Sequence, residues 1–387
     1  MSSYSPRPAP RPRRRAWLIA LPLGIFALLA LAWTGFWFYA AHRADIEITR
    51  WRAREAQHGH MFACSRQDIG GYPFRIEVRC TDPQADLRAW QPPIVLAAKG
   101  ALVTVQVYDP TLLIGEFTGP LRIAENSRNV AIVADWKLAQ ASLRGRPSAP
   151  ERLSIVLDNV KIAERDSGTI TNVANAEHIE LHGRLIGGSA ADNPVVELGV
   201  RLTQGTASGL QILAQPTDGV AAATVYGLHD LSPKPWRQVL RELAQVDGRI
   251  EISQARLTQG DIAAVGAGTL TVKPDGRLDG QIRLTIAGIE RVVALLGLDE
   301  AVKQYVAQRT GGGMTVDKLA SGLDRLMPGL GGAVRGQSGA NLAAVGISML
   351  GEQTQLDGRR AVALPLRFAS GAVFLGPIPI GQLPPLF

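Results

Sequence analysis

The sequence predicts a mainly β protein with a few helices, in which one N-terminal transmembrane helix precedes an elongated, curved antiparallel β-sheet. Three observations support this prediction: an uncharged apolar run near the N-terminus, alternation of apolar and polar residues along most of the remaining chain, and turn signals at short intervals. The composition agrees, because the 387 residues include 41 glycines and only 6% aromatic residues. Such a composition favours strands and turns over a compact helical enzyme.

The membrane helix is expected over residues 16–41, a stretch without a charged side chain. A helix needs about 20 residues to cross the hydrocarbon core of a bilayer, so the run is long enough. The segment after it carries charges of both signs, whereas the residues before it include no acid and five bases, Arg7, Arg11, Arg13, Arg14 and Arg15. The positive-inside rule therefore places the basic tail of residues 1–15 in the cytoplasm and the rest of the chain across the membrane.

A cleaved signal peptide is the alternative interpretation, because it also begins with basic residues and an apolar run. This run is longer than the roughly 7 to 15 residues of a signal core, and Ala40-Ala41 before His42 is a poor cleavage site. Residues 42–63 are expected to form a juxtamembrane helix that is either continuous with the membrane helix or hinged to it.

The net charge of +7 does not indicate a nucleic-acid-binding protein. Five of the positive charges belong to the tail of residues 1–15, which determines topology and faces the anionic inner leaflet. The rest of the chain has no basic stripe interleaved with aromatic residues. We therefore expect the membrane, and no nucleic acid, as a partner.

The chain has two cysteines, Cys64 and Cys80, which follow the membrane helix closely. A disulfide between them suits an oxidising compartment. Two buried free thiols are the alternative, and a zinc pair has no partner Cys or His at the usual spacing.

The β-rich domain is expected over residues 64–387. Apolar residues alternate with polar ones in many short runs, of which three examples are Val103-Val105-Val107, Leu153-Ile155-Leu157 and Ile282-Leu284-Ile286. This period of two is typical of strands with one buried face. Turn signals separate the runs at Asp82-Pro83, Asp109-Pro110, Gly187-Gly188, Asp247-Gly248, Asp275-Gly276 and Leu356-Asp357-Gly358. Residues 247–288 therefore read as a meander of three antiparallel strands.

Helical inserts are expected near residues 232–247 and 289–327. Ser232 is the predicted N-cap of the first, with Pro233 at the first helical position. The second insert divides into helices over 289–308 and 316–326, joined by the glycines at 311–313. The proline- and glycine-rich C-terminal segment cannot be helical.

One group of polar residues resembles a catalytic or metal site. His178, Glu180 and His182 alternate with Ile179 and Leu181, so they project from one face of a strand, and paired histidines can bind zinc. The alternative is an ordinary solvated strand face. The sequence contains no nucleophile elbow, phosphate loop or dinucleotide fingerprint, and we predict no catalytic residue, cofactor, metal site or enzymatic activity.

The apolar side of the predicted sheet allows two structures. It either forms a groove for an acyl chain or a partner, or packs on itself as a closed core. Both require the same alternation, so the sequence does not separate them.

The segment GGYPFRIEVRC, from Gly70 to Cys80, together with Cys64 before it and AWQPPIVLAAKGALVTVQVYDP after it, resembles the DUF2125 family of uncharacterised bacterial proteins. LPLRFASGAVFLGPIPIG, from Leu364, is similar to that family's closing motif. Pro73 fixes a turn that leads into a strand. The meander of residues 247–288 also resembles, in pattern, the AsmA-like envelope proteins, whose sheets form lipid-accommodating grooves.

The apolar run, the placement of the basic residues and the two cysteines predict a single-pass protein of a bacterial inner membrane, with its bulk in the periplasm. The leading hypothesis is a protein that accommodates lipid or lipid-like molecules in envelope maintenance. The alternative is a structural adaptor without enzymatic activity that binds another envelope protein.

Overall fold

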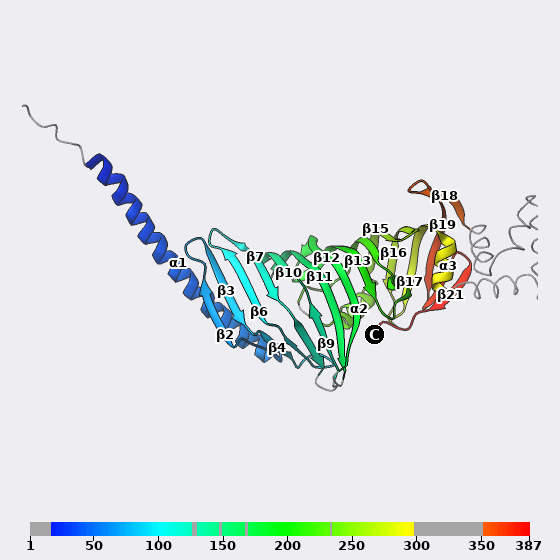
Figure 1. Ribbon diagram of the computed structural model, residues 1–387, viewed down its shortest axis with the longest axis horizontal. Coiled ribbons are helices and arrows are strands. Elements are labelled where there is room, and N and C mark those ends of the chain that lie inside the picture. Colours follow the sequence, from blue (N-terminus) through cyan, green and yellow to red (C-terminus); the bar gives the residue numbers. More distant parts are fainter. Residues whose placement is uncertain (1–16, 126–129, 147–148, 167–168, 233, 298–350) are drawn as a thin grey trace, which may run out of the picture.

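The computed structural model consists of a long N-terminal helix followed by a large, curved antiparallel sheet (Figure 1). It describes residues 17–125, 130–146, 149–166, 169–232, 234–297 and 351–387. The described helices are α1 (Trp17–Gln57), α2 (Trp236–Gln245), α3 (Ile289–Leu296) and the 3-10 turn η1 (Gln211–Leu213). The predicted fold class is therefore confirmed.

Helix α1 joins the expected membrane helix and the juxtamembrane helix without a hinge. It ends at Gln57, because Gly59 adopts a left-handed backbone conformation (φ +79°) that favours helix termination. Residues 60–63 form strand β1 (His60–Ala63), where the juxtamembrane helix was expected to continue.

The strands divide into two arms that share one long strand, β11 (Ala149–Asp166). The first arm reaches β11 in the order β2 (Arg66–Gly70), β3 (Arg75–Thr81), β6 (Gly100–Gln106), β7 (Asp109–Thr118) and β10 (Leu138–Arg146). The second arm reaches it in the order β1, β4 (Gln84–Leu87), β5 (Ile94–Ala97), β8 (Leu121–Glu125) and β9 (Val130–Asp135). All pairings are antiparallel.

The chain passes repeatedly between the two arms. β3 continues into β4 through Pro83, and β7 continues into β8 through Gly119-Pro120. Proline has no backbone N–H to donate to the ladder, so these positions interrupt one arm and start the other.

Beyond β11 the sheet continues as a single series. Its order is β12 (Thr169–Ser189), β13 (Asp192–Ala207), β14 (Thr217–Tyr226), β15 (Arg249–Gln259), β16 (Ile262–Val272), β17 (Leu278–Ala287) and β19 (Arg359–Ala369). β19 also pairs with β18 (Glu352–Leu356) and with β20 (Ala372–Leu375), which pairs with β21 (Ile378–Gln382).

The three-strand meander of residues 247–288 is confirmed as β15, β16 and β17. The turn expected at Gly187-Gly188 is wrong. Both glycines lie within β12, where the pairing with β13 shifts register on either side of Gly187. Gly188 has a φ of +69°, so the glycines form an irregularity inside a strand, and the turn follows Ser189.

The first helical insert is shorter than expected. Helix α2 begins at Trp236 with Pro235 at its N-cap, so the predicted Ser232 cap is wrong. The Ser232 hydroxyl instead donates to the Asp230 carboxylate. Helix α3 begins at Ile289 as predicted and ends at Leu296, followed by Gly297 at φ +62°. Residues 298–308 of the helix expected over 289–308, the linker at 311–313 and the helix expected over 316–326 lie outside the described residues.

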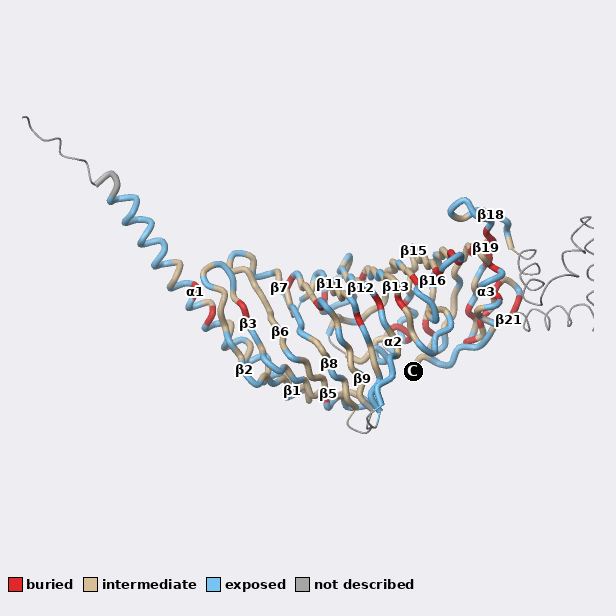
Figure 2. The backbone as a smooth tube through the Cα atoms, in the orientation of Figure 1, coloured by how far each residue is buried: buried red, intermediate tan, exposed pale blue. Residues whose placement is uncertain are grey.

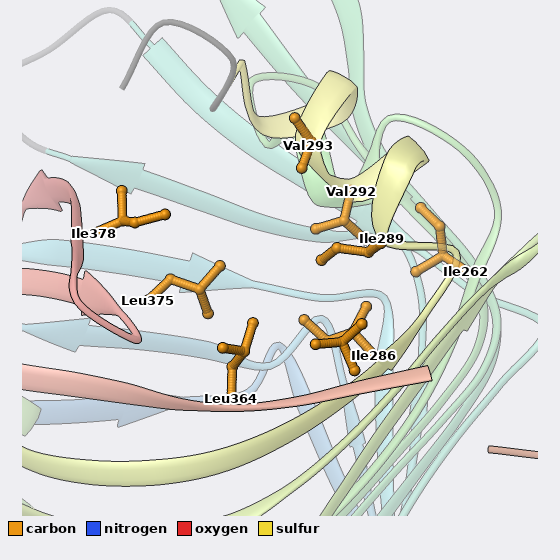
Figure 3. Packing of buried hydrophobic residues seen from close by; sticks show 9 residues of the cluster. Ile262, Ile286, Ile289, Val292, Val293, Leu364, Leu375 and Ile378 are labelled. Atoms are coloured by element: carbon orange, nitrogen blue, oxygen red, sulfur yellow. The ribbon is translucent and has the colours of Figure 1, made fainter. Parts of the chain in front are cut away.

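The main hydrophobic core lies at the C-terminal end of the sheet, where α3 packs on β16, β17 and β19 and where β20 and β21 close the cluster (Figure 3). Val293 of α3 and Leu364 of β19 are 0% and 1% exposed. In Figure 2 buried residues concentrate where α3, β19 and β21 meet, whereas the strands of the first arm are mostly intermediate or exposed.

Candidate functional site

One side of the sheet is apolar from one end to the other. Residues that lie opposite each other in adjacent strands project to the same face, so the strand register defines rows across the sheet. The first such row contains Val78, Val103, Gly115, Ala141, Ile155, Leu181, Val200, Ala221, Ala255, Gly266, Leu284 and Leu364. We call the side on which this row lies the apolar face.

A second row runs beside the first on the same face. It contains Ile76, Val105, Leu113, Leu143, Leu153, Gly183, Leu198, Ala223, Ile252, Gly268, Ile282 and Leu366. Neither row contains a polar or charged residue. The apolar face is therefore continuous from β3 to β19.

The two ends of this face differ in how far they are covered. At the C-terminal end α3, β20 and β21 pack on it, and Leu364 is 1% exposed. In the middle Leu153, Leu181, Leu198 and Val200 are 39–43% exposed. Large aliphatic side chains side by side on three neighbouring strands, β11 to β13, form an exposed apolar patch of the kind that marks an interaction surface.

The opposite side of the same strands is polar. The row through Glu116, Gln140, Glu180, Arg201 and Arg256 lies there, with only a few apolar members. Gln140 donates to Glu116 at 3.2 Å, and the Arg201 guanidinium lies 3.4 Å from the Glu180 carboxylate. This side satisfies its polar groups within the sheet and with solvent.

The predicted cluster of His178, Glu180 and His182 lies on this polar side of β12. The Nδ1 atom of His178 lies 2.6 Å from Asp158 on β11, and its Nε2 atom lies 2.9 Å from Glu180. The ring of His182 bridges Glu180, at 3.3 Å, and the hydroxyl of Ser154, at 3.0 Å. The structure thus brings the three predicted residues together with two residues of β11 that the sequence did not point to.

The carboxylates change the ionisation of this cluster. Hydrogen bonds to Glu180 and then to Asp158 raise the pKa of His178 above its ordinary value, because they favour the charged imidazolium. The same bonds, first from His178 and then from His182, lower the pKa of Glu180. The described residues contain no group of three or more His, Cys, Asp or Glu side chains that could hold a metal ion. Both ring nitrogens of His178 are already engaged in hydrogen bonds, so the arrangement is a hydrogen-bonded network of partly exposed groups.

A cavity of about 600 Å³ lies where the N-terminal part of β12 meets the end of β13 and the turn η1. Its lining is mainly small and apolar, with Val173, Ala207, Leu210 and Leu213 among the residues that form it. The cavity holds no cluster of ionisable side chains that would indicate chemistry.

The predicted disulfide between Cys64 and Cys80 is confirmed, with the two Cα atoms 5.5 Å apart. Cys64 lies between β1 and β2, and Cys80 lies in β3. The bond therefore ties the connection between the two arms to the first paired strands of the sheet.

Helix α1 is long and apolar enough to cross a membrane, which supports a single-pass anchor. Residues 20–32 are all exposed, and Phe26 and Leu31 are 71% and 74% exposed. Large apolar side chains that contact no other part of the chain are expected where lipid surrounds a helix.

Comparison with known proteins identifies a family. A family model described as an uncharacterized protein conserved in bacteria (DUF2125) matches residues 37–384. No curated protein matches the chain.

Proposed function

We propose that this chain, which belongs to the DUF2125 family, is a membrane-anchored protein whose apolar face accommodates the acyl chains of lipids. The observation that supports this most strongly is the open middle of the apolar face, where Leu153, Leu181, Leu198 and Val200 are exposed on two rows that contain no polar residue. We also propose that the sheet lies in the periplasm of a bacterium, that α1 crosses the inner membrane, and that the protein acts in envelope maintenance without catalysis.

The dimensions of the face suit a lipid. Strands lie about 4.8 Å apart, so a row across the twelve strands from β3 to β19 measures about 50 Å. One leaflet contributes about half of the ~30 Å hydrocarbon core, so an extended acyl chain needs only ~15 Å of such a surface. Each methylene that leaves water contributes about 0.8 kcal/mol, so an acyl chain outside the bilayer is stabilised by contact with an apolar surface.

The uneven burial of the apolar face supports the same proposal. A sheet that closed on itself as a core would bury its middle as it buries its C-terminal end. Here Leu181 is 39% exposed while Leu364, on the same row, is 1% exposed. The face therefore changes from a filled core to an open surface along its length.

Photocrosslinking in cells tests the proposal on the full chain. A benzophenone amino acid replaces Leu181 or Val200, in cells whose phospholipids carry radioactive phosphate, and the denatured protein is analysed for bound label after irradiation. The matched control is Val220, which is also 39% exposed but lies on the polar side of the neighbouring strand β14. Phe26 of α1 is the positive control for contact with bilayer lipid.

We expect phospholipid label at positions 181 and 200 and little at position 220. If positions 181 and 200 carry no more label than position 220 while position 26 is well labelled, the result contradicts acyl-chain binding. Crosslinks from 181 and 200 to a protein instead of lipid identify the chain as an adaptor.

A further inference from the structure

We propose that the turn between β2 and β3, residues 71–74, is a second membrane contact, which sits in the headgroup region of the bilayer that α1 crosses. This inference goes beyond the function proposed above, because the turn can contact the bilayer whether or not the apolar face binds lipid. It rests on how the turn is fixed to α1, on its position along that helix, and on the side chains that it exposes.

The turn is fixed to α1 by hydrogen bonds. The indole N–H of Trp33 donates to the carbonyl oxygen of Pro73, and that of Trp37 donates to the carbonyl oxygen of Arg75, both at 2.8 Å. The hydroxyl groups of Thr34 and Tyr72 lie 2.9 Å apart.

Ring contacts strengthen the same junction. The ring of Tyr72 meets that of Trp37 edge to face, with 5.5 Å between centroids, and the rings of Trp33 and Phe74 lie 6.4 Å apart. Trp37 is only 5% exposed, so it is buried between the helix and the turn. The turn is therefore held at a fixed position along the axis of α1.

The position of the turn along α1 corresponds to the end of the expected membrane span. The uncharged run begins at Ala16, and about 20 helical residues cross the hydrocarbon core, so the core ends near Phe36. Trp33 and Trp37 lie within about one helical turn of that position, and tryptophan is enriched at the interface between lipid and water. The turn that binds these two residues consequently lies at the same depth.

The side chains at the tip suit this environment. Tyr72 and Phe74 are 54% and 62% exposed. They belong to a short segment, residues 69–74, that contains no charged residue. The neighbouring turn between β6 and β7 adds Tyr108, which is 69% exposed, and the backbone N–H of Val107 donates to the carbonyl oxygen of Phe74 at 3.0 Å. Three exposed aromatic rings on two adjacent turns match the preference of such rings for the headgroup region.

This position also explains where the apolar face begins. Ile76 and Val78 of β3 follow the turn directly and are members of the two apolar rows. With the turn in the headgroup region, the first strands of the face start at the surface of the bilayer. A lipid that leaves the membrane there meets an apolar surface without crossing water.

Depth measurement by electron paramagnetic resonance tests the inference on the full chain. A nitroxide is attached through a ketone-bearing amino acid, which leaves the disulfide of Cys64 and Cys80 intact, and the protein is reconstituted into vesicles of phosphatidylcholine and phosphatidylglycerol. Collision rates with oxygen, which dissolves in the acyl region, and with a neutral nickel chelate, which stays in water, report the depth of each label.

Labels replace Phe74 and, independently, Tyr108. Trp236, which is 59% exposed, is the matched control in water, because it belongs to α2, which lies away from β2 and β3 in Figure 1. Phe26 marks the lipid interior.

We expect the ratio of oxygen to nickel collisions at positions 74 and 108 to lie several-fold above that at 236 and below that at 26. A ratio at both 74 and 108 equal to that at 236 overturns the inference. A water-like ratio at position 26 overturns it as well, because α1 then does not cross the bilayer. Position 108 decides the result if the label at 74 disturbs the turn.

Discussion

At the scale of single residues, neighbouring positions on one strand have opposite roles. Leu181 faces the open apolar surface, whereas Glu180 and His182 form hydrogen bonds on the polar side. This division follows from the strand period of two, which sends consecutive side chains to opposite faces. A single charged substitution therefore has different consequences on the two sides.

Leu181→Asp is expected to reduce lipid crosslinking from position 200 by about tenfold or more. A carboxylate on the apolar face must be desolvated by an acyl chain, and a loss of 1.4 kcal/mol already corresponds to a factor of about ten. Stability should change by only about 1 kcal/mol or less, because Leu181 is 39% exposed. Val220→Asp, on the polar side, should leave crosslinking unchanged. Equal losses in the two variants would show that the apolar face is not the site.

Glu180→Gln is expected to lower the pKa of His178, because the hydrogen bond to Glu180 is the largest cause of its elevation. Asp158→Asn should lower it by less. Proton NMR titration of histidine-labelled protein measures both shifts. An unchanged titration of His178 in Glu180→Gln would contradict the network.

The shifted pKa values of His178 and Glu180 make the stability of the fold depend on pH. A raised pKa of His178 stabilises the fold fully below its ordinary value of 6.5, and this contribution is lost as the pH rises through the raised value. A lowered pKa of Glu180 stabilises the fold above 4.5, and this contribution is lost as the pH falls through the lowered value. Glu180→Gln should therefore destabilise the protein most between pH 4.5 and 6.5, as measured by urea denaturation.

At the scale of elements, α3 acts as a cover for one end of the apolar face. Its residues Ile289, Val292 and Val293 belong to the same buried cluster as Ile286 of β17 and Leu364 of β19 (Figure 3). The two rows are apolar along the whole face, at its exposed middle as well as at its buried end. Burial at this end therefore results from α3, β20 and β21, and not from the strands alone.

Leu364→Ala is expected to destabilise the protein by about 2–5 kcal/mol, because it creates a cavity in a filled core. Leu198→Ala removes the same atoms from the same face but should cost roughly 1 kcal/mol or less, since Leu198 is 41% exposed. Urea denaturation of both variants measures the difference. Similar costs would show that the middle of the face is covered and would contradict an open surface.

The disulfide is expected to stabilise the junction of the two arms. A loop closed over a separation of 16 residues corresponds to about 3 kcal/mol in the chain-entropy model. Replacing both cysteines, as Cys64→Ser with Cys80→Ser, should lower stability by this order and expose β1 to β3 to protease first. Limited proteolysis followed by mass spectrometry locates the first cuts, and cuts confined to other strands would contradict the proposed role.

At the scale of the whole molecule, α1, which is long and apolar enough to cross a membrane, is fixed to the sheet at the end where β2 and β3 lie (Figure 1). The basic tail before α1 predicts that the sheet lies on the side opposite the cytoplasm. Alkaline phosphatase, which is active only after export, fused behind Phe387 should therefore be active in a bacterial host. Glutamate at all five positions of Arg7, Arg11, Arg13, Arg14 and Arg15 should reduce that activity severalfold. An inactive fusion on the unaltered chain, with the protein in the membrane fraction, would reverse the predicted orientation.

Several features of the fold could be predicted from local patterns. The alternation in Leu153-Ile155-Leu157 and Ile282-Leu284-Ile286 predicted strands β11 and β17, and Cys64 and Cys80 predicted their disulfide. Two predictions from local patterns were wrong. Ser232 was expected to cap a helix but bonds Asp230, and Gly187 was expected in a turn but lies inside β12. A glycine or serine fits several structures, and its neighbours in space decide among them.

The exposed middle of the candidate site could not be predicted in this way. The same alternation is visible in Val196, Leu198, Val200 and Leu202, but it did not show whether anything covers these residues. The likeness of the meander to AsmA-like proteins stays a prediction. Likewise, the hydrogen bonds of Trp33 and Trp37 to the β2–β3 turn join segments about 40 residues apart, and no local pattern in the sequence pairs these segments.

The sequence by itself determined the apolar helix, the predominance of antiparallel strands, the single disulfide and the DUF2125 resemblance, because each depends on residues close together in the chain. Only the tertiary structure decided that the apolar residues of twelve strands align into unbroken rows, and that α3 covers these rows at one end while the middle is exposed. The physical reason is that alternation fixes which side of a strand is apolar, whereas strand register and packing against distant elements fix whether that side becomes a core or a surface.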